Sequence, residues 1–134
     1  MARWPRVSPL TWMVGVLLAA TFLRLVAWQA APPGLRFDEM LVFDQTDRIR
    51  AGARPIYLDD LAEEPLYHYA FAAAEDLMGP QLFTLRWLSA ALGLIAVASI
   101  YALGRHLFTP RVGLLAAALA AAAFWSLLYS RIGL

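Results

Sequence analysis

Residues 82–107, LFTLRWLSAALGLIAVASIYALGRHL, decide the fold of this 134-residue chain. The stretch is apolar throughout, and its charges, Arg86 and Arg105, lie near its two edges. At 1.5 Å per residue, a helix of this length is long enough to cross a hydrocarbon layer of about 30 Å. The stretch therefore predicts a transmembrane helix and an integral membrane protein.

Two further apolar runs flank this segment, and the chain as a whole is 61% hydrophobic. Residues 10–31 contain a single charge, and residues 112–131 are mostly alanine and leucine. The first run is longer than the 7–15 apolar residues of a cleaved signal peptide, which favours an uncleaved span. We expect an all-α protein with three transmembrane helices, in which the alanine-rich third helix packs closely against protein.

The charged residues are segregated along the chain. All ten acidic residues fall within the connection 32–81, whereas arginines precede the first run and separate the last two. The positive-inside rule places the N-terminus in the cytoplasm and the acidic connection on the extracytoplasmic face. A net charge of +1 with scattered arginines gives no indication of a nucleic-acid partner. Without cysteine, the chain can form neither disulfides nor thiolate metal sites.

Arg24 is the single charge in the first run, near its outer end. Its side chain can extend to the membrane surface, which is the interpretation we favour, or face the interior of a helix bundle.

Two short helices are expected within the connection, both lying along the membrane surface. The first begins at Asp38, which we expect to be its N-cap, and continues to Gly52. The second covers residues 64–79, with Pro65 at its first helical position. An irregular alternation of apolar and charged residues is typical of helices at a lipid–water boundary.

Asp38 and Glu39 are the candidate catalytic residues. Asp38 is equally well explained as a helix cap or as a general base. A carboxylate at the membrane surface can take the proton of an acceptor hydroxyl, while a cation steadies a phosphate leaving group. Arg24, Arg36 and Arg86 are the cations near that boundary. This chemistry alone does not single out glycosyl transfer, because an acidic loop could also gate a transporter.

Glu64, Tyr67 and His68 form a second group of polar residues. They could hold a polar headgroup, bind a metal through Glu64 and His68, or form an aromatic belt at the interface. Zinc usually takes three or four protein ligands, so we predict no metal and no cofactor, although a divalent ion stays open.

The ordered set of motifs resembles the N-terminal part of GT-C fold glycosyltransferases, specifically the bacterial family 39 and aminoarabinose-transferase-like enzymes related to protein O-mannosyltransferases. The resemblance covers essentially the whole chain. Its motifs are LRL at 23–25, GLRFDE at 34–39, IRAGARPIY at 49–57, EPLYHY at 64–69, LRWLSA at 85–90, GRHLF at 104–108 and WSLLYSRIGL at 125–134.

The resemblance implies transfer of a sugar from a polyprenyl-phosphate-linked donor in the membrane to a glycan, lipid or protein acceptor. It assigns the general base to Asp38, with Glu39 in support. Glu64, Tyr67 and His68 then line the substrate site, and Arg86 meets the donor phosphate. The family's fold continues through further spans, so we expect a fragment that is inactive alone. The alternatives are a non-catalytic membrane subunit with an acidic outer loop and a transporter segment.

Overall fold

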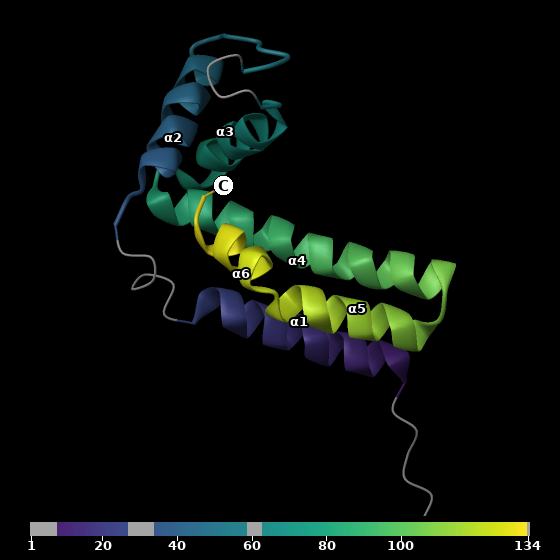
Figure 1. The fold of residues 1–134 in the computed structure, drawn as a ribbon. Coiled ribbons are helices and arrows are strands. Elements are labelled where there is room, and N and C mark those ends of the chain that lie inside the picture. Colours follow the sequence, from purple (N-terminus) through teal and green to yellow (C-terminus); the bar gives the residue numbers. More distant parts are fainter. Residues whose placement is uncertain (1–7, 27–33, 59–62, 134) are drawn as a thin grey trace, which may run out of the picture.

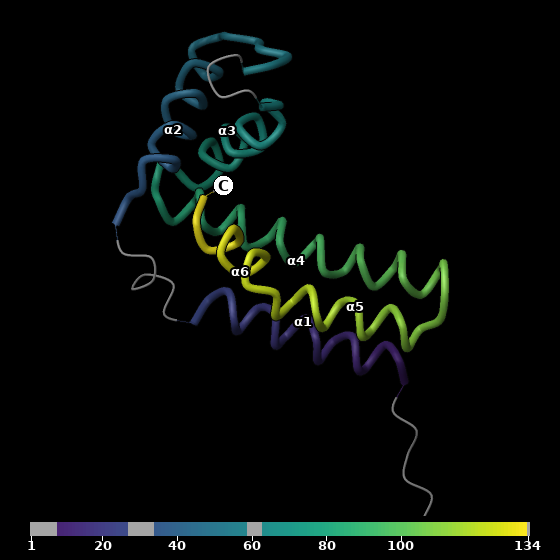
Figure 2. The backbone as a smooth tube through the Cα atoms, in the orientation of Figure 1, coloured from purple at the N-terminus to yellow at the C-terminus, as the bar shows by residue number. Residues whose placement is uncertain are grey.

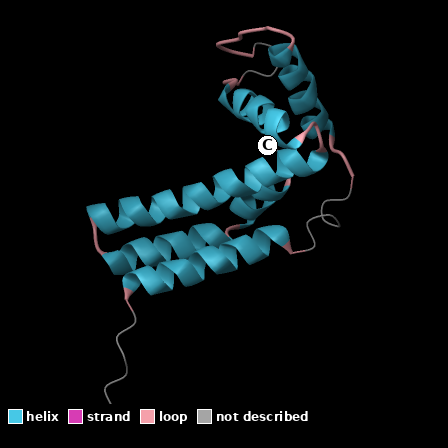
Figure 3. Ribbon diagram, turned by 180° about the vertical axis from the view of Figure 1, so that it is seen from behind, coloured by secondary structure: helices cyan, strands magenta, loops and turns pink. Residues whose placement is uncertain are grey.

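A computed structural model describes residues 8–26, 34–58 and 63–133, most of which are helical. Figures 1 and 3 show the arrangement from opposite sides, and Figure 2 traces the backbone. The six helices of the described part are α1 (Pro9–Leu25), α2 (Phe37–Arg50), α3 (Leu66–Met78), α4 (Leu82–Leu107), α5 (Pro110–Ala122) and α6 (Phe124–Arg131). The expected all-α class is confirmed.

Helices α1, α4 and α5 lie side by side as a bundle, and α2 and α3 sit at the end where α4 begins (Figure 1). The bundle core consists of apolar side chains from all three helices: Met13, Ala20, Val97, Tyr101, Ala117 and Ala121. Outside this core, large side chains such as Trp12, Leu18 and Leu119 are more than half exposed. Apolar surface of this extent requires a covering of lipid or further protein.

The α4–α5 hairpin is closed by small residues and a cap. The hydroxyl of Thr109 accepts a hydrogen bond from the Val112 N–H at 3.3 Å, and Pro110 takes the first helical position of α5. A Cβ at Gly104 would lie 2.8 Å from the Cα of Gly113, so these two backbones touch. Gly113, Ala117 and Ala121 of α5 thus face protein, as expected. Leu115 and Leu119 are exposed, whereas Leu114 packs partly against the core.

The three expected spans differ in how far the structure supports them. Helix α4 coincides with the predicted range and is long and apolar enough to cross a membrane. Helix α1 is apolar but has only 17 residues, and part of the predicted 10–31 lies outside the described residues. The prediction of one continuous third span is wrong, because α5 and α6 meet at Ala123 with a bend of 56°. By length and composition, these two helices together fit either one broken span or a re-entrant loop.

Arg24 lies at this bend and is only 1% exposed, so the favoured interpretation, extension to the membrane surface, is wrong. Its guanidinium donates to the hydroxyls of Ser130, at 3.1 Å, and Ser126, at 2.9 Å. It also donates to the carbonyls of Ala20, at 3.2 Å, and Ala121, at 3.5 Å. The break at Ala123 leaves the Ala121 carbonyl without a helical partner, and Arg24 satisfies it from the neighbouring helix.

Helices α2 and α3 pack against each other and against the start of α4 through Val42, Phe71 and Leu85. Phe43 meets Phe71 edge to face, with ring centroids 5.1 Å apart. Both helices were expected, but two boundaries differ. The N-cap of α2 is Arg36 rather than Asp38, and Pro65 precedes α3 as its N-cap instead of opening it.

Candidate functional site

Glu39 is the centre of the candidate site, and its side chain is fully buried. Its carboxylate accepts a hydrogen bond from the backbone N–H of Arg36 at 2.9 Å, which closes the first turn of α2. Its other oxygen accepts from the backbone N–H of Gly133, just beyond α6, at 3.2 Å. One carboxylate therefore joins the start of α2 to the end of α6.

Arg86, on the second turn of α4, completes this cluster. Its Nε lies 2.9 Å from Glu39 Oε1 and its Nη2 lies 3.2 Å from Glu39 Oε2, the two-pronged geometry that a guanidinium gives a carboxylate. The same Nη2 donates to the carbonyl of Gly34 at 2.6 Å. Arg86 is only 5% exposed, so the ion pair is buried as a unit.

The environment fixes Glu39 in its charged form. Burial alone would raise the pKa of Glu39, but the hydrogen bonds from Arg86 and from the two backbone N–H groups outweigh it, and the pKa is lowered. A carboxylate held in this way by donors from three segments is a weak base. Its arrangement suits the positioning of neighbouring groups.

Asp38 precedes Glu39 in the first turn of α2, and its side chain is exposed. Since Arg36 is the N-cap, the capping explanation of Asp38 does not apply. Within residues 8–26, 34–58 and 63–133, no side chain pairs with its carboxylate. The structure thus places the exposed carboxylate of Asp38 beside the buried, hydrogen-bonded carboxylate of Glu39.

Tyr67 lies close to this pair on the first turn of α3. Its hydroxyl is 2.6 Å from the hydroxyl of Ser89 on α4. Burial and the negative charge of Glu39 raise the pKa of Tyr67 to about 12, although the hydrogen bond with Ser89 opposes the shift. The phenol is therefore neutral at physiological pH and can donate a hydrogen bond.

His68 and Glu64 do not come together as a metal-binding pair. Glu64 is exposed, whereas His68 is 1% exposed and has Glu63 as its acidic neighbour, with His68 Nε2 3.5 Å from Glu63 Oε1. That contact lacks hydrogen-bond geometry, and both ring nitrogens of His68 are without a partner among the described residues. Burial lowers the pKa of His68 despite Glu63. No group of three acidic, histidine or cysteine side chains suited to a metal occurs in the described ranges.

Two contributions to the site have no signal in the sequence. Gly133 acts through its backbone N–H, and Ser89 is a small polar residue within a long apolar helix. Arg24 is different, because Ser126 and Ser130 are four residues apart and so share one helical face. That spacing could have indicated its bundle-facing position.

Residues 62–133 match the family model described as dolichyl-phosphate-mannose-protein mannosyltransferase. The matched range begins before α3 and includes Glu64, Tyr67, His68 and Arg86, but not Asp38 or Glu39. No curated protein and no solved structure matches the chain. The family match agrees with the resemblance drawn from the sequence motifs. Because it covers more than half of the chain, the protein belongs to the dolichyl-phosphate-mannose-protein mannosyltransferase family.

Proposed function

We propose that the protein transfers a sugar from a polyprenyl-phosphate-linked donor to an acceptor hydroxyl at the extracytoplasmic face of the membrane. Membership of a mannosyltransferase family supports the reaction class. The apolar helix α4 and the exposed apolar surface of α1 and α5 support a membrane location. The charge segregation supports a cytoplasmic N-terminus.

The single observation that carries the proposal is the pairing of exposed Asp38 with buried Glu39. In the proposed reaction, Asp38 accepts the proton of the acceptor hydroxyl as its oxygen attacks the anomeric carbon of the donor sugar. The bond between that carbon and the phosphate oxygen breaks, and the polyprenyl phosphate leaves with the electron pair. A glycosidic bond forms in its place.

Glu39 and Arg86 are proposed as positioning residues for Asp38. Their ion pair holds the first turn of α2 against α4, and any shift of Glu39 would move the adjacent Asp38. Because the guanidinium of Arg86 is already engaged by Glu39 and Gly34, contact with the donor phosphate would require it to share these bonds.

Tyr67, His68 and Glu64 are proposed to line the acceptor side. Tyr67 can donate a hydrogen bond close to Glu39, and Glu64 is open to solvent just before α3. His68 is only 1% exposed, so its proposed contribution is to support the start of α3 rather than to touch the acceptor. A glycan, lipid or protein hydroxyl fits this scheme equally well.

Asp38→Asn tests the proposal, with Asp44→Asn as the matched control on the same helix. Both aspartates are exposed, and Asp44 pairs with Arg48 away from the cluster. Membranes containing each variant are given a tritiated polyprenyl-phosphate sugar, and label in the acceptor is counted. Loss of a general base is expected to lower transfer by about 100-fold or more. In membranes where the wild type transfers label, equal transfer by Asp38→Asn and the control would overturn the proposal.

A further inference from the structure

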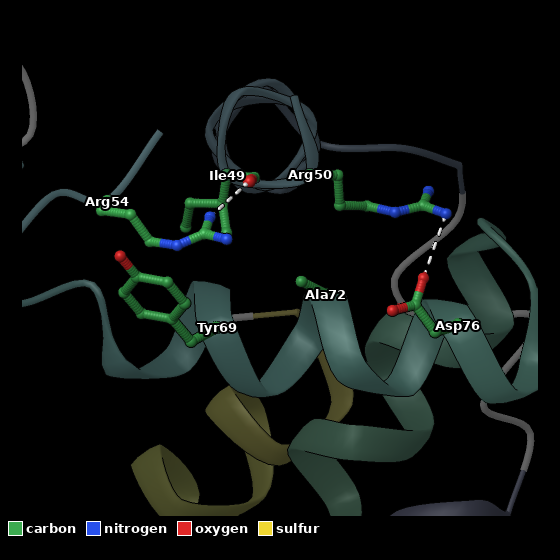
Figure 4. A pocket seen from close by; sticks show the side chains of 6 residues that line it. All are labelled: Ile49, Arg50, Arg54, Tyr69, Ala72 and Asp76. Carbon is green, nitrogen blue, oxygen red and sulfur yellow. Dashed lines mark hydrogen bonds and ion pairs between the residues drawn. The ribbon is translucent and has the colours of Figure 1, made fainter. Parts of the chain in front are cut away.

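A cleft of about 660 Å³ lies between the C-terminal half of α2 and the outer face of α3 (Figure 4). Its lining comprises Ile49, Arg50, Arg54, Tyr69, Ala72 and Asp76. Arg50 is about twelve residues from Asp38 along α2, a separation of about 18 Å. The cleft is thus distinct from the cluster around Glu39.

Arg54 supplies an unused pair of donors to this cleft. Its Nη1 donates to the carbonyls of Ile49, at 3.2 Å, and Ala53, at 2.9 Å, and so caps the end of α2. These bonds hold the guanidinium between α2 and the ring of Tyr69 (Figure 4). Nε and Nη2 have no hydrogen-bond partner within residues 8–26, 34–58 and 63–133. This edge of a guanidinium matches the two oxygens of a carboxylate or phosphate.

The opposite end of the cleft is acidic. Arg50 is bound there by Glu75, at 3.3 Å, and by Asp76, at 3.2 Å, so its charge is compensated. Asp76 lies two helical turns from Tyr69, about 10 Å along α3. Arg50 binds its Oδ1, and its other oxygen has no partner among the described residues. An anion beside Arg54 would therefore be remote from this acidic end, whereas hydroxyl groups of a ligand could donate to it.

Tyr69 and Ala72 form the wall between the two ends. The hydroxyl of Tyr69 donates to the carbonyl of Pro55 at 3.1 Å, which fixes the ring at the edge of the cleft. The half-buried ring of Tyr69 offers a flat, apolar face about the size of a sugar ring, and Ala72, which is 9% exposed, lines the cleft beside it. Such a surface, next to a two-pronged cation and a hydroxyl acceptor, suits a sugar that carries an oxyanion.

We propose that the α2–α3 cleft binds the phosphate or carboxylate of an acidic sugar, with Nε and Nη2 of Arg54 as the donors and Tyr69 against the sugar. Binding here does not depend on sugar transfer. Its failure would leave the proposed transferase function intact, and the converse also holds.

Calorimetric titration of the detergent-solubilised protein tests the proposal, with glucose 6-phosphate, inorganic phosphate and glucose as probes. Glucose 6-phosphate is expected to bind about tenfold or more tightly than glucose, because a charge-assisted bidentate contact is strong. It is also expected to bind more tightly than inorganic phosphate, and Tyr69→Leu is expected to abolish that second difference. Equal binding of phosphate and glucose 6-phosphate would overturn the sugar part of the proposal.

Arg54→Gln is expected to weaken glucose 6-phosphate binding about tenfold or more. Arg48→Gln is the control, since Arg48 lies on α2 outside the cleft and pairs with Asp44, and its affinity should stay within twofold. Arg54→Lys separates loss of the anion site from loss of the helix cap. Lysine can still bind the two carbonyls, but it lacks the two-pronged edge of a guanidinium. Wild-type affinity in both Arg54 variants, or equal affinity for glucose and glucose 6-phosphate, would overturn the proposal.

Discussion

Two arginines are buried, Arg24 in the helix bundle and Arg86 at the junction with α2, and their guanidinium groups are stabilised by different kinds of partner. Arg24 is held by two serine hydroxyls and two carbonyls, and no carboxylate contacts it within the described residues. Arg86 is held mainly by the carboxylate of Glu39. Because the partners of Arg24 are neutral dipoles, its removal leaves no buried charge without a counter-charge among the described residues. The ion pair makes the junction mutually dependent, since neither partner is stable in the interior alone.

Arg86→Met is therefore expected to have the largest effect on stability. It leaves the Glu39 carboxylate buried without its main partner, which costs about 3–5 kcal/mol. Denaturant unfolding in detergent micelles measures the loss. In the double variant Arg86→Met with Glu39→Leu, most of the lost stability should be recovered, because the buried charge is gone. A double variant as unstable as the single one would contradict this account of the junction.

Gly93→Ala is expected to come next, since it disturbs the packing around Arg24. A Cβ at Gly93 would fall on the hydroxyl of Ser130 and lie 3.0 Å from Arg24 Nε. Overpacking of this kind costs about 1–3 kcal/mol. Gly15→Ala is the control, because its Cβ would meet nothing within 4 Å. Thermal unfolding measures the effect, and Gly93→Ala is expected to melt at a lower temperature than Gly15→Ala. Equal melting temperatures would argue against a tight fit at Gly93.

Arg24→Met should cost less, about 1–2 kcal/mol, because it strands only neutral groups. Ser130 keeps its bond to the Ser126 carbonyl at 2.6 Å, so part of the network survives. The same unfolding measurement applies. A loss as large as that of Arg86→Met would show that the charge of Arg24 has an acidic partner.

The smallest expected effect is a loss of stability in acid at the junction, where Glu39 titrates, and not in the bundle around Arg24. The folded pKa of Glu39 lies below its usual 4.5, so the folded protein binds this proton more weakly than the unfolded chain does. The stabilisation is complete above about pH 4.5 and is lost as the pH falls through the folded pKa. The wild type should be more stable than Glu39→Gln at pH 7, and the difference in unfolding free energy should shrink towards pH 3; a difference that stays constant with pH would contradict this expectation.

The sequence predicts the elements better than it predicts their contacts. Helix α4 has its predicted bounds because a long apolar run between arginines leaves few alternatives. The break at Ala123 is not predictable, since alanine is the best helix former and only the tertiary contacts of Arg24 and Ser130 favour it.

For the candidate site, too, the sequence predicts the residues better than their contacts. The pair Asp38 and Glu39 is visible in the sequence, but the division between an exposed and a buried carboxylate depends on Arg86. The contribution of Gly133 depends on where α6 ends, and that position follows from the bend. Long-range backbone contacts of this kind leave no trace in local residue patterns.

The hydrogen bonds of Glu39 also determine when this part of the protein can fold during synthesis. Arg86 is made 47 residues after Glu39, and Gly133 is made 94 residues after it. At about 5–20 residues per second, the last donor emerges roughly 5–20 s after the carboxylate that it binds. Until Arg86 has been made, the buried site for the carboxylate cannot form, and until Gly133 has been made one of its donors is missing. The earliest part of the candidate site is thus completed by a segment that is synthesised 94 residues later.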